Sequence, residues 1–141
     1  MRAGGVLETV LYADDLAAAE AFYRDVLGLA VYARQEGRQV FFKLDGQMLL
    51  IFNPAATSEP ISPAARLPVP PHGAVGPGHV CFSASAREIE SWKAHLKSRG
   101  VVIESDFRWP TRDGSEGGRS IYFRDPAGNC LEFGEPRIWG F

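Results

Sequence analysis

Apolar residues recur at two different spacings in the first part of the chain. Residues 6–12, Val-Leu-Glu-Thr-Val-Leu-Tyr, are a run of β-forming side chains and predict a strand. The apolar positions then change to helical spacing, and Asp14 is a good N-cap for the helix that they predict. Gly28 follows the last of these positions, where a helix C-terminus favours a residue that tolerates positive φ. The apolar positions of this helix are Leu16, Ala19, Phe22, Tyr23, Val26 and Leu27.

Three short β-forming runs follow the helix. They span residues 30–35, 39–44 and 48–53, and Gly37 and Asp45-Gly46 separate them as hairpin turns. The first part of the chain is therefore predicted to run strand, helix, strand, strand, strand.

A proline-rich segment comes next. Seven of the ten prolines lie between Pro54 and Pro77. Because proline fixes φ and lacks an amide donor, this segment is predicted to be a linker or loop without regular structure.

The first pattern then returns. Ser85 and Glu88 have the spacing of a capping box, and Gly100 ends the helix that they begin. The helical stripe consists of Ile89, Trp92 and Leu96, and strands are predicted at 79–84, 101–107, 119–124 and 130–133.

The two patterns form an internal repeat with ten extra residues in its second copy, which we expect as a loop over 109–118. Each copy alone is too small to bury much core. We therefore expect an α+β fold in which two βαβββ repeats form paired mixed sheets around a cleft. The whole chain, 1–141, is predicted to be one domain, divided into repeat one (5–53), a linker (54–77), repeat two (78–135) and a tail (136–141).

Composition excludes several classes of protein. The 15 Lys and Arg nearly balance the 17 Asp and Glu, which argues against nucleic-acid binding by phosphate neutralisation. No run approaches the roughly 18 apolar residues that span a membrane, and the first residues lack the apolar core of a secretion signal. Two cysteines, Cys81 and Cys130, do not make a disulfide scaffold and are expected to be reduced, buried thiols in a cytoplasmic protein.

The repeat and its motifs resemble the vicinal oxygen chelate superfamily. That group includes glyoxalase I, extradiol dioxygenases, fosfomycin-resistance enzymes and bleomycin-binding proteins. The resemblance covers nearly the whole chain and implies the paired-sheet fold, a small-molecule substrate and a homodimer. It rests on residues 7–16, 21–29, 78–82 and 118–133, the last of which contains Tyr-Phe-Arg-Asp-Pro-Ala-Gly-Asn-Cys-Leu-Glu.

The resemblance implies four places for metal ligands. These places correspond to Glu8, Leu50, His79 and Glu132. Leu50 has no ligand atom, which departs from the four-ligand glyoxalase I pattern. The remaining Glu8, His79 and Glu132 suit a divalent Fe, Mn, Zn or Ni ion and leave positions open for two adjacent substrate oxygens. Glu8 is either a ligand or a general base that takes a proton from the substrate.

Further residues are candidates for substrate contact. Ser120 and Tyr122 have the same parity in one predicted strand and so point to one face, where the resemblance implies that they hold substrate. Tyr122 is either catalytic or a core aromatic with a satisfied hydroxyl. Arg119, with the opposite parity, is expected to face solvent or the helix layer. The apolar and loop candidates for substrate binding are Leu50, Phe42, Trp109 and His72, the last being either a cleft residue or an ordinary surface histidine.

Two functions therefore remain open from the sequence. The first is a metal-dependent enzyme that carries out lyase, isomerase, dioxygenase or epoxide-opening chemistry. The second is a metal-free protein that sequesters a small drug-like ligand, as bleomycin-resistance proteins do. The ligand set with its His79–Glu132 pair favours the enzyme, because a pure binding protein does not need it.

Overall fold

The computed structural model describes residues 1–112 and 114–141, and these divide into two compact units. Unit 1 is Met1–Gly78 and unit 2 is His79–Phe141. Each unit contains one four-stranded mixed sheet, so the predicted α+β fold with two βαβββ modules is confirmed. In the described part of the chain, no helix has the length and apolar character needed to cross a membrane.

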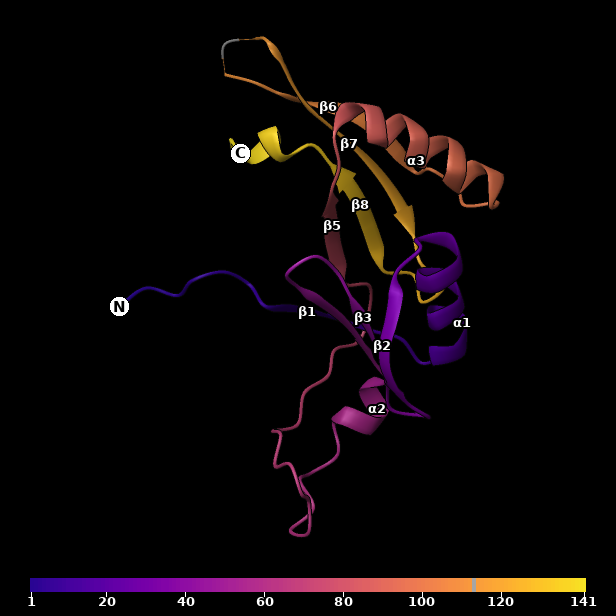
Figure 1. Ribbon diagram of the computed structural model, residues 1–141, viewed down its shortest axis with the longest axis vertical. Coiled ribbons are helices and arrows are strands. Elements are labelled where there is room, and N and C mark those ends of the chain that lie inside the picture. Colours follow the sequence, from indigo (N-terminus) through magenta and orange to yellow (C-terminus); the bar gives the residue numbers. More distant parts are fainter. Residues whose placement is uncertain (113) are drawn as a thin grey trace. The chain divides into compact units, whose positions relative to one another are not determined.

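Unit 1 has the strand order β1-β4-β3-β2 (Figure 1), in which β1 and β4 are parallel and the other pairs antiparallel. One face of this sheet buries the side chains of Leu11, Phe42 and Ile51 beneath α1 and the turn that follows it. The elements of unit 1 are β1 (Glu8–Tyr12), α1 (Leu16–Ala21), a π-helical turn (Phe22–Val26), β2 (Ala30–Gln35), β3 (Gln39–Lys43), β4 (Met48–Phe52) and α2 (Pro54–Thr57).

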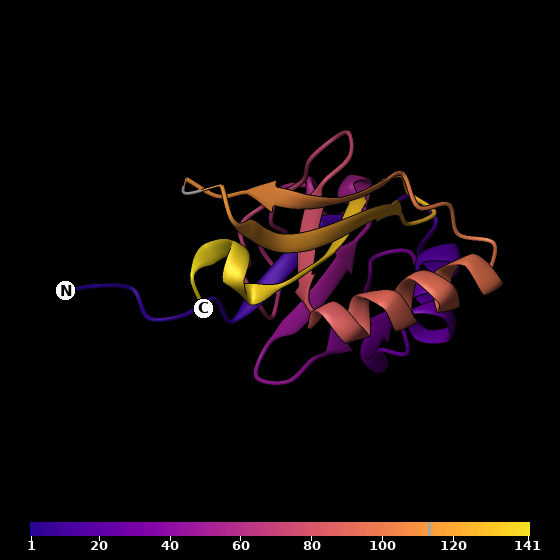
Figure 2. The same cartoon turned by 90° about the horizontal axis from the view of Figure 1, so that it is seen from above.

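Unit 2 repeats this topology as β5-β8-β7-β6. Figure 2 shows α3 along one face of the sheet, where Phe133 stacks on Trp92 at a centroid distance of 4.5 Å. The predicted capping box of α3 is confirmed. The Ser85 side chain accepts a hydrogen bond from the backbone amide of Glu88, and the Glu88 carboxylate accepts one from the backbone amide of Ser85. The elements are β5 (His79–Ser83), α3 (Ala86–Ser98), β6 (Ser105–Pro110), β7 (Glu116–Arg124), β8 (Cys130–Gly134) and a 3-10 turn (Pro136–Trp139).

Four local predictions differ from the structure. The strand expected at 101–107 begins only at Ser105 and ends at Pro110. The first helix is capped by Asp15 and not by Asp14, because the Asp15 carboxylate accepts the amide of Ala18. The proline-rich segment begins with α2, since Asn53 caps it and Pro54 occupies a position whose missing amide costs nothing. The loop expected over 109–118 is shorter than predicted, because residues 109–110 belong to β6 and residues 116–118 belong to β7, while residue 113 lies outside the described residues.

Gly117 permits this long hairpin. A Cβ atom added there would lie 2.0 Å from the carbonyl oxygen of Trp109 on the facing strand. A side chain is therefore excluded, and the two strands approach closely beyond the point where the predicted strands end.

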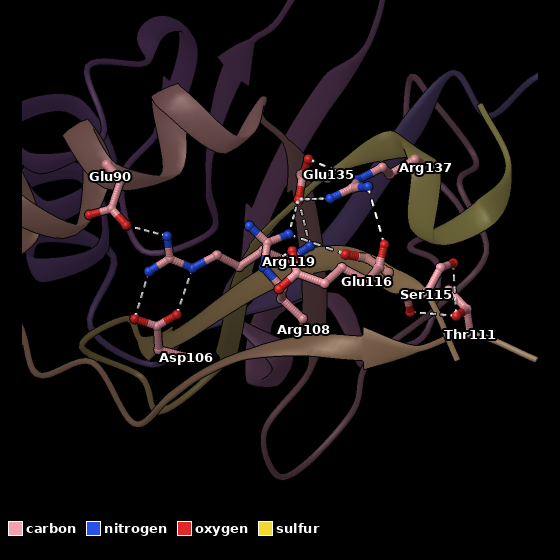
Figure 3. A network of polar contacts seen from close by, with 10 residues as sticks. Glu90, Asp106, Arg108, Thr111, Ser115, Glu116, Arg119, Glu135 and Arg137 are labelled. Carbon is pink, nitrogen blue, oxygen red and sulfur yellow. Dashed lines mark hydrogen bonds and ion pairs between the residues drawn. The ribbon is translucent and has the colours of Figure 1, made fainter. Parts of the chain in front are cut away.

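A network of ion pairs ties this hairpin to α3 and to the C-terminal turn (Figure 3). Arg119 Nε and Nη2 donate to the two carboxylate oxygens of Asp106 at 2.7 and 2.8 Å, and Arg119 also pairs with Glu90 of α3. Its side chain thus lies on the helix side of the sheet, which is one of the two places that its strand parity allowed. The hydrogen bonds from Arg119 hold the pKa of Asp106 well below its usual range, with Lys93 adding to the effect.

We expect Asp106→Asn to lower the free energy of unfolding by about 1 kcal/mol at neutral pH, since the side chain is partly exposed. A carboxyl group whose pKa is depressed in the folded state stabilises the fold above its unfolded pKa of about 3.9, and this contribution is lost as pH falls through the folded pKa. The difference between variant and wild type should therefore narrow below about pH 4. Urea unfolding at several pH values measures it, with Glu104→Gln at the exposed Arg124 pair as the control. A difference that stays constant down to pH 2 would contradict the assignment.

Candidate functional site

The open face of the second sheet gathers the candidate residues of unit 2. In the strand register, Glu132 of β8 lies opposite Cys81 of β5 on one side and opposite Tyr122 of β7 on the other. Because side chains alternate along a strand, His79 and Ser120 share this face, and their neighbours in sequence point to α3. The sheet register therefore brings together four of the predicted site residues: His79, Ser120, Tyr122 and Glu132.

His79 and Glu132 form the centre of the site. His79 Nε2 lies 3.3 Å from Glu132 Oε2, while His79 Nδ1 lies 2.9 Å from the carbonyl oxygen of Cys130. A carbonyl oxygen only accepts, so Nδ1 carries a proton. In the neutral ring, Nε2 then presents a lone pair to a carboxylate oxygen. Two acceptors at this distance are compatible only when a proton or a cation lies between them.

The second oxygen of Glu132 strengthens this argument. Glu132 is 4% exposed, and its Oε1 is buried without a hydrogen-bond partner. A buried carboxylate oxygen without a partner is costly and needs an explanation such as a bound ion. The carboxylate and imidazole donors fit a divalent metal of the Mn, Fe, Zn or Ni type.

Two neighbouring groups respond to this carboxylate. Burial, the negative charge of Glu132 and a hydrogen bond with its carboxylate raise the pKa of the Cys81 thiol to about 12. The same causes, in the same order, raise the pKa of Tyr122 to about 12. Without a bound cation both groups therefore keep their protons at neutral pH. A hydrogen bond from a protonated Tyr122 hydroxyl to a substrate oxygen is compatible with this state.

His79 and Glu132 would supply two ligands to a bound metal ion. Among residues 1–112 and 114–141, no three His, Cys, Asp or Glu side chains are arranged as a ready-made metal site. Glu8 belongs to unit 1, and its role as third ligand or base stays a prediction.

Aromatic side chains form a row beside the pair on the same face. Tyr122 stacks on His79 at 6.2 Å and on Phe107 at 5.9 Å, and Phe107 in turn contacts Trp109 at 5.1 Å. Phe107 and Trp109 are 40% and 39% exposed, so their faces are available to a ligand. Ser120 lies beneath this row, fully buried, and its hydroxyl accepts a hydrogen bond from Trp109 Nε1 at 2.9 Å.

Phe107 is the member of this row that sequence reasoning missed. The signal was present, because Phe107 and Trp109 are two positions apart and so share a face of any strand. The strand was predicted to end at residue 107, which separated the two aromatics.

Unit 1 has different side chains at the positions equivalent to the His79–Glu132 site of unit 2. Its register pairs Glu8 with Met48 at the place of His79, and Val10 with Leu50 at the place of Cys81 and Glu132. Leu50 is 6% exposed and gives this face an apolar side chain where unit 2 has its carboxylate.

Phe42 and His72 are the remaining candidates. Phe42 is fully buried on the helix side of its sheet, with its ring 5.3 Å from that of Tyr23. This position does not favour contact between Phe42 and a substrate. His72 is half-buried in unit 1, where its Nδ1 lies 2.8 Å from the Tyr12 hydroxyl and its ring meets Phe52 edge-on.

Residues 5–133 match the model of the Glyoxalase/Bleomycin resistance protein/Dioxygenase superfamily. Among solved structures, a lactoylglutathione lyase from Agrobacterium tumefaciens is 46% identical, with 100% of both chains covered and a TM-score of 0.89. A glyoxalase/bleomycin resistance protein/dioxygenase from Nocardioides is 23% identical over 100% of this chain and 88% of that chain, with a TM-score of 0.72. The oxidase ChaP-H2 is 23% identical over 95% and 94% of the two chains, with a TM-score of 0.58. The two more distant structures support the fold alone. A search of curated proteins gave no match.

Proposed function

Because the chain belongs to the Glyoxalase/Bleomycin resistance protein/Dioxygenase superfamily, we propose that it is a divalent-metal-dependent enzyme acting on a small substrate with two adjacent oxygen atoms. The observation that carries the proposal is the His79–Glu132 pair, whose facing atoms and unpartnered buried oxygen would be satisfied by a bound cation. The 46% identical lactoylglutathione lyase supports a lyase among the possible reaction classes.

The residues of the open face have separate roles in this proposal. His79 and Glu132 would hold the metal, and Glu8 would be the third ligand. A bound divalent ion would polarise a substrate carbonyl and stabilise developing negative charge. The Tyr122 hydroxyl would donate a hydrogen bond to a substrate oxygen. Phe107 and Trp109 would pack against the apolar part of the substrate and exclude water from it.

The experiment that tests the proposal is metal titration of protein purified without chelators. We expect one divalent ion per chain by elemental analysis, or uptake of one ion when Mn²⁺, Ni²⁺ or Zn²⁺ is added to the apoprotein. The loaded protein is then assayed for S-lactoylglutathione formation from methylglyoxal and glutathione. Failure to retain or take up a metal would reject the proposal.

A metal-free binding protein is the alternative, and the exposed aromatic row of Phe107 and Trp109 favours it. In that case a flat, apolar ligand would bind with the same affinity in the presence of a chelator and in the presence of a divalent metal. Fluorescence of Trp109 during ligand titration distinguishes the two cases, with Trp109→Phe identifying its signal.

The variant Glu8→Gln separates the two roles of Glu8. If Glu8 is a ligand, we expect metal affinity to fall by about 10- to 100-fold, because a neutral amide replaces a charged donor. If Glu8 is a base, metal affinity stays within about twofold while turnover falls by about 100-fold or more. Isothermal titration with Mn²⁺ and an activity assay at saturating metal measure the two effects. A variant with unchanged affinity and turnover would remove Glu8 from the site.

A further inference from the structure

Unit 1 contains a cavity that the proposed metal centre does not use. It lies between the open face of the first sheet and the proline-rich segment, with a volume of about 750 Å³. This size is within the range of roughly 300–1,000 Å³ that is typical of small-molecule sites. All of its lining residues come from unit 1.

The ends of the covering segment are fixed to α2 and the β2–β3 hairpin. Arg38 Nη1 donates to the carbonyl oxygen of Ala56 at 2.7 Å, and the amide of His72 donates to the carbonyl oxygen of Thr57 at 3.0 Å. Gly73 packs so closely on α2 that an added Cβ atom would lie 2.5 Å from Ser58 Oγ. The segment is therefore held over the sheet at both ends, and the space beneath it is part of the fold.

The floor of the cavity is aromatic. Phe41 and Phe52 meet edge-to-face at 5.2 Å, and the His72 ring stands edge-on to Phe52 at 4.8 Å. The hydrogen bond between His72 Nδ1 and the Tyr12 hydroxyl holds the histidine ring in this orientation.

The charges around the cavity are unequal. Arg38 and Arg66 line it together with one acid, Glu59, which leaves a net positive lining. Arg38 is half-buried, and its bond to Ala56 uses only one of the five donors of a guanidinium group. Arginine recognises carboxylates through paired donors, so this cavity complements one negative charge on an apolar body.

We propose that this cavity is a second binding site, for a small monocarboxylate with an aromatic ring. The ring would lie on Phe41 and Phe52, and the carboxylate would accept hydrogen bonds from Arg38 and Arg66. The cavity lining includes none of Glu8, His79 and Glu132, the residues proposed to hold the metal.

Isothermal titration of the full chain with 3-phenylpropanoate tests the proposal. The neutral 3-phenylpropanamide and the ring-free acetate are titrated in parallel. We expect saturable binding of 3-phenylpropanoate, with the amide and acetate each at least about tenfold weaker, because each lacks one recognition element. The imidazole NMR signals of His72 should shift with the same saturation curve. Equal binding of the amide would overturn the role of the arginines, equal binding of acetate would overturn the aromatic floor, and the absence of saturable binding would overturn the site.

Two variants identify the cations. Arg66 is exposed, so the Arg66→Gln variant should fold normally. The Arg38→Gln variant also loses the hydrogen bond to the carbonyl oxygen of Ala56, so its stability is checked by thermal unfolding. Each should weaken 3-phenylpropanoate binding about tenfold, whereas Arg87→Gln on the exposed side of α3 should leave it unchanged. Glu132→Gln should also leave it unchanged, which separates this site from the metal centre. Unaltered affinity in both arginine variants would refute the proposal.

Discussion

Glu132→Gln is expected to lower the affinity for a divalent metal by about 100-fold or more while leaving the metal-free protein at least as stable as wild type. The two effects have one cause. The carboxylate is 4% exposed, and one of its oxygens has no partner. Removing its charge removes a ligand, and it also removes the cost of burying an anion beside the lone pair of His79.

This combination distinguishes a metal ligand from a structural acid. If Glu132 only supported the sheet, the variant would lose stability and metal affinity would not be the property that changes most. Isothermal titration with Mn²⁺ and thermal unfolding in chelator measure the two quantities on the same samples. Glu104→Gln, at an exposed ion pair of the same unit, is the matched control and should change neither. Metal affinity retained in Glu132→Gln would refute the ligand assignment.

Phe133→Ala is expected to lower the free energy of unfolding by about 3–5 kcal/mol, the largest loss of stability in unit 2. Phe133 is 4% exposed and its ring lies within 5.6 Å of the rings of Phe82, Trp92 and Phe123. Deleting it leaves a cavity between the sheet and α3 that these rigid rings cannot fill. Because β8 also carries Glu132, metal affinity should fall with stability.

Phe107→Ala is the matched control for this loss. It deletes the same ring from the same sheet, but from the open face, where Phe107 is 40% exposed. We expect a cost of about 1 kcal/mol, since much less apolar surface is returned to water. Urea unfolding of both variants measures the difference. Similar losses in the two variants would show that packing against α3 is not the main source of stability.

The sequence predicted the parts of the fold and site that depend on repetition and parity. The order of strands and helices follows from the internal repeat, and the capping box of α3 follows from the spacing of Ser85 and Glu88. The choice of His79 and Glu132 as site residues came from the family resemblance, and the parity of β7 added Tyr122 to it. These features of the fold need only the periodicity of strands and the pairing of the first strand with the last strand in each copy.

The features that were missed depend on contacts between residues distant in the sequence. Phe41 and Phe42 are both apolar, and only the register of β3 decides that Phe42 faces Tyr23 while Phe41 faces the open side. The long hairpin depends on the approach of Gly117 to Trp109, which the composition of that segment does not reveal. The cavity under the proline-rich segment requires its ends to return to α2, and no local pattern predicts this return.

The pairing of β5 with β8 also has a kinetic consequence. These strands begin and nearly end unit 2, and their parallel pairing closes the whole unit into one loop. Such pairing carries a high loop-closure entropy and forms slowly. Because His79 lies on β5 and Glu132 on β8, an ion bound by both residues would link these two strands and stabilise their pairing. We expect it to slow the opening of the unit, so that metal loading would set the lifetime of the folded chain as well as its chemistry.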